Sequence, residues 1–221
     1  MRNRDILDCI RDLSVPRPLV VVCGGGLGTS TRQYMSLYPK SVHVFEPNQL
    51  SFAALRDKYV NNKNITVNKT VVTSYTGTIE FVSRNPTLTS GVYRPTAFMK
   101  EINGMKMIGD TASVPCCTLS DYVDLHGLDA IDILEIVTEG SELDVLRGCT
   151  TIFHKIGLIR VCVIVAQLYE PAYRLHHIDE ILSKDFLLFN FFNSYYDDTG
   201  RLFRTDCLYV SKQNSYWRGH G

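Results

Sequence analysis

The stretch LVVVCGGGLGTSTRQY, Leu19 to Tyr34, decides the fold of this chain. Its apolar opening, residues 19–23, has the length and composition of a buried strand, and residues 29–37 have those of a helix. Between them, four glycines allow a sharp turn and let the backbone approach a ligand that any Cβ would keep away. The free N–H groups and the partial positive charge at the start of the helix favour a phosphate or a carboxylate. The stretch therefore predicts a strand–turn–helix unit that binds a nucleotide-like ligand.

Short apolar strands alternate with helical segments along most of the chain, which indicates a parallel sheet joined by right-handed crossovers. The last two expected strands, 186–192 and 202–210, flank the turn Asp197-Asp198-Thr199-Gly200 and predict an antiparallel hairpin. We therefore expect an α/β fold of the Rossmann-like class I methyltransferase type: a seven-stranded, mostly parallel sheet with a C-terminal antiparallel hairpin and helices on both faces. The other expected strands of this sheet are 19–23, 41–45, 65–72, 131–137 and 158–165, and short strands are expected at 77–82 and 92–95. The expected helices are 29–37, 49–60, 119–125, 142–147 and 177–183.

We expect residues 1–221 to form a single domain, because 221 residues with 45% hydrophobic and 21% charged side chains suit one globular unit with a sizeable core. Apolar residues recur at helical spacing within residues 1–16, which predicts an N-terminal helix. Residues 96–113 contain glycine and methionine without a clear period. We expect residues 84–113 to be an insertion or loop over one edge of the sheet, where an acceptor would bind.

Charge and hydropathy exclude several classes of function. Lysine plus arginine and aspartate plus glutamate number 23 each, so the chain has no electrostatic case for binding nucleic acid. No window approaches the roughly 18 apolar residues of a membrane span, and the N-terminus lacks the apolar region of a signal peptide. Seven cysteines, several of them inside apolar strands, indicate free thiols in a reducing compartment. We therefore expect a cytoplasmic protein.

The spacing of the glycines distinguishes between cofactors. Read as GxGxxG, the pattern requires a glycine at position 29, where Thr29 stands; read as GxGxG, it is complete with Gly24, Gly26 and Gly28. The second spacing is typical of sites for S-adenosylmethionine (SAM). Glu46 ends the next strand, where a carboxylate can accept hydrogen bonds from both ribose hydroxyls of an adenosine. Together with Thr29 these residues form the predicted cofactor site, although such a turn can also serve close packing alone.

Four segments resemble the FkbM-type SAM-dependent methyltransferases over most of the chain: VVVCGGGLG, VHVFEPN, IDILEIVTEGSELDVLRG and TDCLYV. The third is the most specific, because it matches the family's Glu-Gly pair after a strand and its Leu-x-Gly after the following helix. The resemblance implies a Rossmann-like fold, SAM as the methyl donor and O-methylation, commonly of sugar or polyketide hydroxyls. It also implies a glycan or small glycoside as acceptor, and adjacent or fused glycosyltransferase domains.

Two valines depart from the family pattern. Val22, two residues before the first glycine, and Val137, two residues before the Glu-Gly pair, stand where members usually have aspartate. These replacements motivate an alternative hypothesis: a catalytically silent module that binds SAM or adenosine, or serves a structural role. A nicotinamide oxidoreductase is a third hypothesis, which Thr29 and the terminal hairpin disfavour.

Methyl transfer to a hydroxyl requires alignment of the acceptor oxygen and a base that takes its proton. Glu139 is the best candidate for this base, since it directly follows the fourth parallel strand; a Glu in the first turn of a helix can also serve only as a cap. Thr138 is expected at the same strand end, and His176 is an alternative base that would reach over the site. Glu142, one turn beyond Glu139, is expected to face solvent.

The loops offer candidate residues for binding the acceptor. Tyr93, Arg94 and Tyr173 would suit a sugar through ring stacking and hydrogen bonds, although loop tyrosines are also ordinary packing residues. No set of histidine, aspartate and glutamate residues has the spacing of metal ligands, so no metal is assigned.

Overall fold

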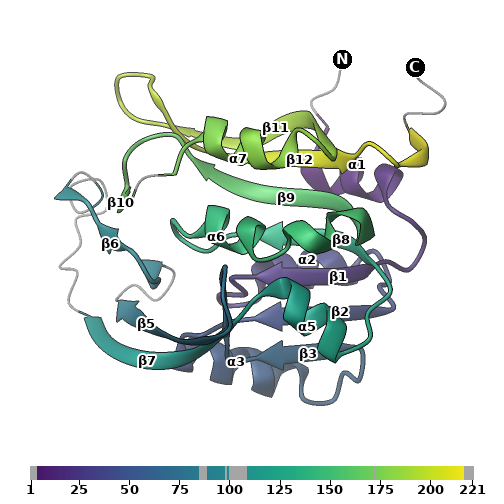
Figure 1. Ribbon diagram of the computed structural model, residues 1–221, viewed down its shortest axis with the longest axis horizontal. Helices are drawn as coiled ribbons and strands as arrows, with labels where there is room; N and C mark the ends of the chain where they lie inside the picture. Colours follow the sequence, from purple (N-terminus) through teal and green to yellow (C-terminus); the bar gives the residue numbers. More distant parts are fainter. Residues whose placement is uncertain (1–3, 85–88, 98, 100–108, 172, 217–221) are drawn as a thin grey trace.

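The computed structural model describes residues 4–84, 89–97, 99, 109–171 and 173–216. Its main feature is a seven-stranded sheet with the strand order β11-β12-β9-β8-β1-β2-β3 (Figure 1). The strands of this sheet are β1 (Leu19–Cys23), β2 (Ser41–Phe45), β3 (Ile65–Asn68), β8 (Ile131–Ile136), β9 (Ile156–Ile164), β11 (Phe186–Tyr196) and β12 (Leu202–Ser211).

The directions of the strands confirm the expected fold class. From β9 through β8, β1 and β2 to β3, every pairing is parallel. β12 pairs antiparallel with both β9 and β11, which makes the C-terminal hairpin. All carboxyl ends of the parallel strands therefore meet at one edge of the sheet, where ligands bind in open α/β folds.

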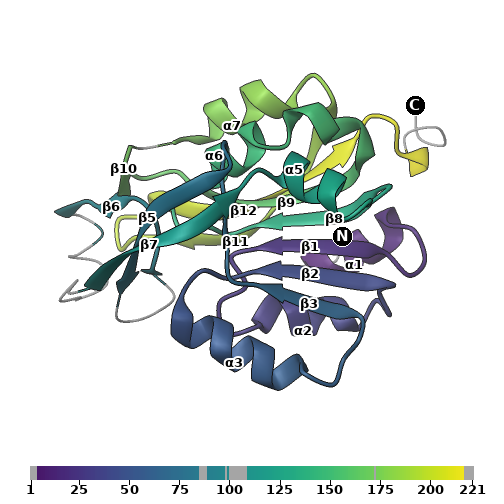
Figure 2. The same cartoon turned by 60° about the horizontal axis from the view of Figure 1, so that its bottom comes forward.

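Helices cover both faces of the sheet, and each face has its own hydrophobic core (Figure 2). Apolar residues one helical turn apart, such as Ile6 and Ile10 in the first helix, are buried against the strands. One face carries α1 (Ile6–Leu13), α2 (Thr29–Met35) and α3 (Gln49–Tyr59); the other carries α5 (Leu119–Leu125), α6 (Glu142–Arg147), the 3₁₀ helix η2 (Thr150–Lys155) and α7 (Leu175–Leu182). No helix in the described ranges is long and apolar enough to cross a bilayer.

A second, three-stranded sheet corrects two expectations. Residues 65–72 do not form one strand: β3 ends at Asn68, and β4 (Val71–Val72) pairs in parallel with β7 (Gly109–Cys117). β7 also pairs antiparallel with β5 (Gly77–Arg84), so part of the region expected to be irregular is a regular strand. The first five residues of β7 are exposed, which explains why they show no apolar period. Most of the connection between β5 and β7 lies outside the described residues.

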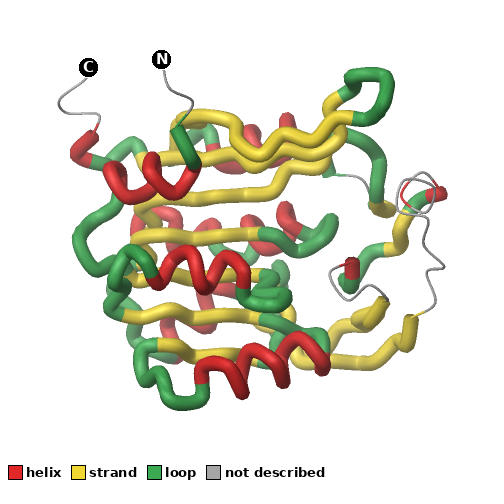
Figure 3. Tube along the Cα trace, turned by 180° about the vertical axis from the view of Figure 1, so that it is seen from behind, coloured by secondary structure: helices red, strands yellow, loops and turns green. Residues whose placement is uncertain are grey.

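The second sheet extends beyond the edge where the parallel strands end, as Figure 3 shows from behind. Near it, β6 (Arg94–Pro95) pairs antiparallel with β10 (Tyr169–Glu170). This pairing connects the segment after β5 with the segment after β9, two stretches that are distant in sequence. Met99 of the same segment packs against Ile164 at the end of β9. The described part of the predicted insertion therefore lies next to the carboxyl end of β9.

Candidate functional site

A cavity of about 280 Å³ opens at the carboxyl ends of β1, β2 and β8. The glycine turn forms one wall, and the residues that directly follow β2 and β8 form two others. Residues 70–72, Phe81, residues 90–92 and one arginine from β12 also line it. Among the lining residues are Gly24, Gly25, Gly26, Thr29, Glu46, Ser90, Gly91, Val137, Thr138, Glu139 and Arg204.

Glycine is required in the turn both by conformation and by space. Gly24 has φ +91°, and a Cβ on it would lie 1.9 Å from the carbonyl oxygen of Val137. Gly28 has φ +82°, and its Cβ would lie 2.8 Å from a methyl group of Leu55. Side chains other than glycine are strained at such φ values. The close approach of β1 to β8 thus depends on Gly24, while the Gly25 and Gly26 backbone faces the cavity.

Glu46 lies at the end of β2 and is only 6% exposed. One carboxylate oxygen accepts from Gly26 N at 2.6 Å, and the other accepts from Asn48 N at 2.8 Å. Burial raises the pKa of Glu46 to about 7, although both backbone donors act in the opposite direction. Each oxygen of a carboxylate has a second acceptor site, so Glu46 can still accept two hydroxyl groups from a ligand in the cavity.

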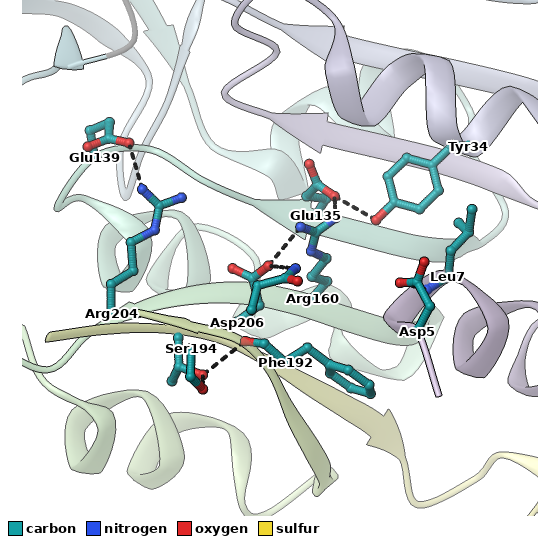
Figure 4. Close-up of polar contacts among 12 residues, drawn as sticks. Asp5, Leu7, Tyr34, Glu135, Glu139, Arg160, Phe192, Ser194, Arg204 and Asp206 are labelled. Carbon is teal, nitrogen blue, oxygen red and sulfur yellow. Dashed lines mark hydrogen bonds and ion pairs between the residues drawn. The ribbon is translucent and has the colours of Figure 1, made fainter. Parts of the chain in front are cut away.

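Glu139 follows β8 with φ +54°, a left-handed conformation that is uncommon for a residue with a side chain. Its Oε2 accepts from the hydroxyl of Tyr169 at 2.5 Å, and its Oε1 lies 3.9 Å from Arg204 Nη1 (Figure 4). Burial, and then the charge of Glu139, raise the pKa of Tyr169, which keeps its phenol protonated as a donor. The Glu139 carboxylate is therefore oriented from two sides at the wall of the cavity.

Glu142 is buried, which corrects the expectation that it faces solvent. Its carboxylate accepts from Thr138 N at 2.9 Å and from Gly140 N at 3.1 Å, and burial raises its pKa to about 7. The backbone folds back over the helix start, so a carboxylate in the first turn satisfies the donors of the preceding loop. Gly140 has φ +105°, and a Cβ there would lie 2.8 Å from the Tyr169 ring. Position 140 of the Glu-Gly pair thus requires glycine, both for its backbone conformation and for the space beside Tyr169.

The sequence analysis did not predict two arginines at the site. Arg204 of β12 lines the cavity, and its buried Nε has no hydrogen-bond partner among the described residues. Arg84, at the end of β5, is 5% exposed and donates to the carbonyl oxygens of Thr89 and Tyr93 at 2.7 and 2.5 Å. Arg84 thereby holds residues 89–93 beside the cavity. A charged residue inside an apolar strand segment, as in LFRTDCLYV, is the signal that could have identified Arg204.

The structure brings Gly24, Gly26, Thr29 and Glu46 together with Thr138 and Glu139 around the cavity. Gly28, the N-cap of α2, is not among the lining residues, and the other candidates lie elsewhere. His176 is exposed on α7, stacks on His177 at 3.9 Å between ring centroids, and lines a separate hollow with Val165 and Leu188. The hydroxyl of Thr138 is buried and has no partner among the described residues.

The three candidates for acceptor binding do not line the cavity. Tyr93 and Tyr173 lie edge to face at 5.9 Å, and both hydroxyls contact the carboxylate of Asp144. Tyr173 also receives a hydrogen bond from Arg147 at 3.3 Å. Arg94 is exposed on β6. Tyr93 and Tyr173 thus form a polar cluster with Asp144 and Arg147 of α6.

A buried polar network lies on the α1–α3 side of the sheet, beside Val22. Glu135 is opposite Val22 in the pairing of β8 with β1, and its Oε2 accepts from the Tyr34 hydroxyl at 2.6 Å and from Arg160 at 2.8 Å. Arg160 also donates to Asp206 at 2.7 Å (Figure 4). A carboxylate thus lies next to Val22, supplied by the neighbouring strand. The described residues contain no group of three or more histidine, cysteine, aspartate or glutamate side chains that could hold a metal ion.

Known proteins share this architecture. Residues 23–191 match the family described as "Methyltransferase FkbM domain". The "2-O-methyltransferase NoeI" of Sinorhizobium fredii is 24% identical over 178 residues, which cover 77% of this chain and 73% of that protein.

Solved structures show the same fold at low identity. Methyltransferase FkbM from Methylobacillus flagellatus has a TM-score of 0.54 and 17% identity over 92% of this chain, which spans half the length of that chain. A putative rRNA-methylase from Clostridium thermocellum has a TM-score of 0.51 and 10% identity, with 94% of each chain covered. The family match covers most of the sequence, including the strand ends and the Glu-Gly loop that form the cavity. The chain belongs to the FkbM methyltransferase family.

Proposed function

We propose that this protein is a SAM-dependent O-methyltransferase whose acceptor is a sugar hydroxyl of a glycan or glycoside. One observation carries the proposal: Glu46 and Glu139 line the same cavity, with the glycine turn between them. A carboxylate for ribose hydroxyls and a carboxylate for an acceptor hydroxyl are the two groups that this reaction requires from the chain. The S. fredii relative is named as a 2-O-methyltransferase, which supports oxygen as the methylated atom.

The residues fit SAM in two respects. Gly24 and Gly25 pack closely against Val137, Val44 and Leu55, and the turn that they form lines the cavity, where a ligand can approach its backbone. Glu46, with Gly26 N and Asn48 N already bound, has two remaining lone-pair positions that can accept the 2′ and 3′ hydroxyls of a ribose. Thr29 and the backbone of Gly26 complete the predicted contacts. SAM would supply an electrophilic methyl group on sulfur.

Glu139 acts as the base in this proposal. Its carboxylate takes the proton of the acceptor hydroxyl as that oxygen attacks, a contribution of about 10²–10⁴-fold in rate. Tyr169 holds one carboxylate oxygen and Arg204 lies near the other, so the side chain is oriented before the acceptor binds. Thr138, whose hydroxyl is buried without a partner among the described residues, can donate to the acceptor or the cofactor.

A silent module remains the second candidate function, since both oxygens of Glu139 already have neighbours in the chain and Val137 lines the cavity in place of an acid. Calorimetric titration with SAM, S-adenosylhomocysteine and NAD tests which cofactor the protein binds. The proposal expects both SAM-type ligands to bind and NAD not to bind; absence of SAM binding at millimolar concentration contradicts it.

Methyl transfer by the wild type then separates an enzyme from a silent binder, and the Glu139→Gln variant tests the base. If the wild type methylates a glycoside, the variant is expected to bind S-adenosylhomocysteine unchanged and to lose at least 100-fold in kcat. Full activity in this variant would exclude Glu139 as the base.

A further inference from the structure

A second hollow, of about 110 Å³, lies directly beyond the Glu139–Arg204 pair. The two hollows share these two residues, so the pair stands between them. Figure 4 shows the Glu139 carboxylate and the Arg204 guanidinium facing each other. A group in the second hollow would therefore lie on the opposite side of the proposed base from the cofactor cavity.

The walls of the second hollow are mainly apolar. Five of its lining residues are Met99, Cys162, Ile164, Leu168 and Phe203. Most of them belong to a small hydrophobic cluster that is separate from the two cores beneath the helices. Of the polar lining residues, Glu142 directs its carboxylate to backbone donors and Glu139 accepts from Tyr169.

Protein interiors rarely keep voids larger than a water molecule, and a void is filled by water only where two to four polar partners are available. The volume of about 110 Å³ exceeds the space that one water requires. Five of the eight lining residues are apolar, and the polar groups of Glu139 and Arg204 lie where the hollow meets the cofactor cavity. The hollow thus suits a compact apolar group attached to an oxygen better than a ring covered with hydroxyls. Arg204, whose Nε has no partner among the described residues, can donate to an acceptor oxygen at the entrance.

We propose that this second hollow is an acceptor subsite that takes a short alkyl or acyl group attached next to the hydroxyl that is methylated. The inference rests on the proposed function and deepens it, because it assigns the chemistry of the acceptor beside the reacting oxygen. Glu139 contacts the hydroxyl, Arg204 the neighbouring oxygen, and the apolar wall the substituent on that oxygen.

Matched pairs of methyl and n-butyl hexosides test the subsite by calorimetry in the presence of saturating S-adenosylhomocysteine. The two members of a pair differ by three methylenes, each worth about fourfold in affinity when fully buried. For at least one hexose, the butyl member is expected to bind on the order of ten- to fiftyfold more tightly in wild type. Steady-state methyl transfer should show the same ratio in KM with little change in kcat.

Two variants at one position change the hollow in opposite directions. The backbone of Leu168 makes its hydrogen bonds with Thr96 and Ala166, so its side chain can be replaced without breaking them. Leu168→Phe fills the hollow and is expected to remove the preference for butyl; Leu168→Ala enlarges it and is expected to extend the preference to hexyl. Leu188→Ala, which alters the separate hollow beside α7, is the matched control and should leave the preference unchanged.

The outcomes distinguish this inference from the proposed function. Failure of S-adenosylhomocysteine to bind wild type contradicts the proposed function itself. If S-adenosylhomocysteine binds, equal affinity for both members of every pair, absence of binding included, overturns the subsite. A butyl preference that persists in Leu168→Phe, with cofactor affinity intact to show correct folding, overturns it as well.

Discussion

Replacement of Glu46 by glutamine is expected to weaken SAM binding and to remove its dependence on pH. In wild type, burial places the pKa of Glu46 near 7 instead of near 4.5, and the ionised form is the one with free lone pairs for ribose hydroxyls. The affinity for SAM is therefore highest above pH 8 and falls as the pH falls through 7. The ionised fraction drops about tenfold between pH 8 and pH 6, so the dissociation constant should rise about tenfold over that range.

The size of the mutational effect follows from the hydrogen bonds. A hydrogen bond to a charged group contributes about 1.5–3 kcal/mol, so loss of one ribose contact costs about 10- to 150-fold in affinity at pH 8. Glutamine also directs an amide N–H₂ toward the backbone N–H of Gly26 or of Asn48, and that donor then loses its acceptor. The variant should therefore bind weakly at every pH between 6 and 8.

Calorimetry with SAM or S-adenosylhomocysteine at pH 6, 7 and 8 measures both effects. Glu80→Gln is a suitable control, because Glu80 is an exposed carboxylate on β5 and does not line the cavity. Wild-type affinity that stays constant from pH 6 to pH 8 would refute the titration argument. A Glu46→Gln variant that binds as tightly as wild type would refute the ribose contact.

Three further predictions concern the loops that form the site. Gly24→Ala is expected to lower the free energy of unfolding, measured in urea, by more than about 3 kcal/mol, because the new Cβ would collide with the carbonyl group of Val137. The control is Gly127→Ala, at φ +58° with nothing within 4 Å, which should cost only about 1 kcal/mol. Tyr169→Phe removes the donor to Glu139, and we expect kcat to fall about tenfold with an unchanged dissociation constant for SAM; an unchanged kcat would contradict the positioning role. Because the pKa of Glu142 is about 7 in the folded protein and near 4.5 in the unfolded chain, its stabilising contribution is complete below pH 4.5 and is lost as the pH rises through 7. The stability of wild type relative to Glu142→Gln should thus fall by about 2–3 kcal/mol between pH 5 and pH 8, and a constant difference would show that Glu142 does not titrate in this range.

Local sequence patterns were sufficient to predict the strands whose ends form the cavity. The apolar runs 19–23 and 41–45 end abruptly at a glycine and at Glu46, so their bounds could be read directly. Since consecutive parallel strands end at one edge, the proximity of Glu46 and the glycine turn also followed from the sequence. The same reasoning placed Glu139 at that edge, where the structure has it.

Other features depend on contacts between segments that are distant in sequence. The pairing of β4 with β7 joins residues 71–72 to 116–117, and two residues are too few to show a period. Tyr169 and Arg204 reach Glu139 from β10 and β12, 30 and 65 residues further along the chain. His176 was predicted to reach over the site because it comes just before a late helix. In the structure it belongs to α7 and is exposed on the surface.

The sequence alone determined the fold class, the glycine turn, and the two carboxylates that follow β2 and β8. Strand periodicity and glycine conformation are local rules, and the common edge of parallel strands is a topological one. Only the tertiary structure decided that Glu142 is buried, that Tyr169 and Arg204 orient Glu139, and that a second hollow lies beyond them. Burial and side-chain orientation at these positions arise from long-range packing, and the raised pKa values of Glu46 and Glu142 are consequences of that burial.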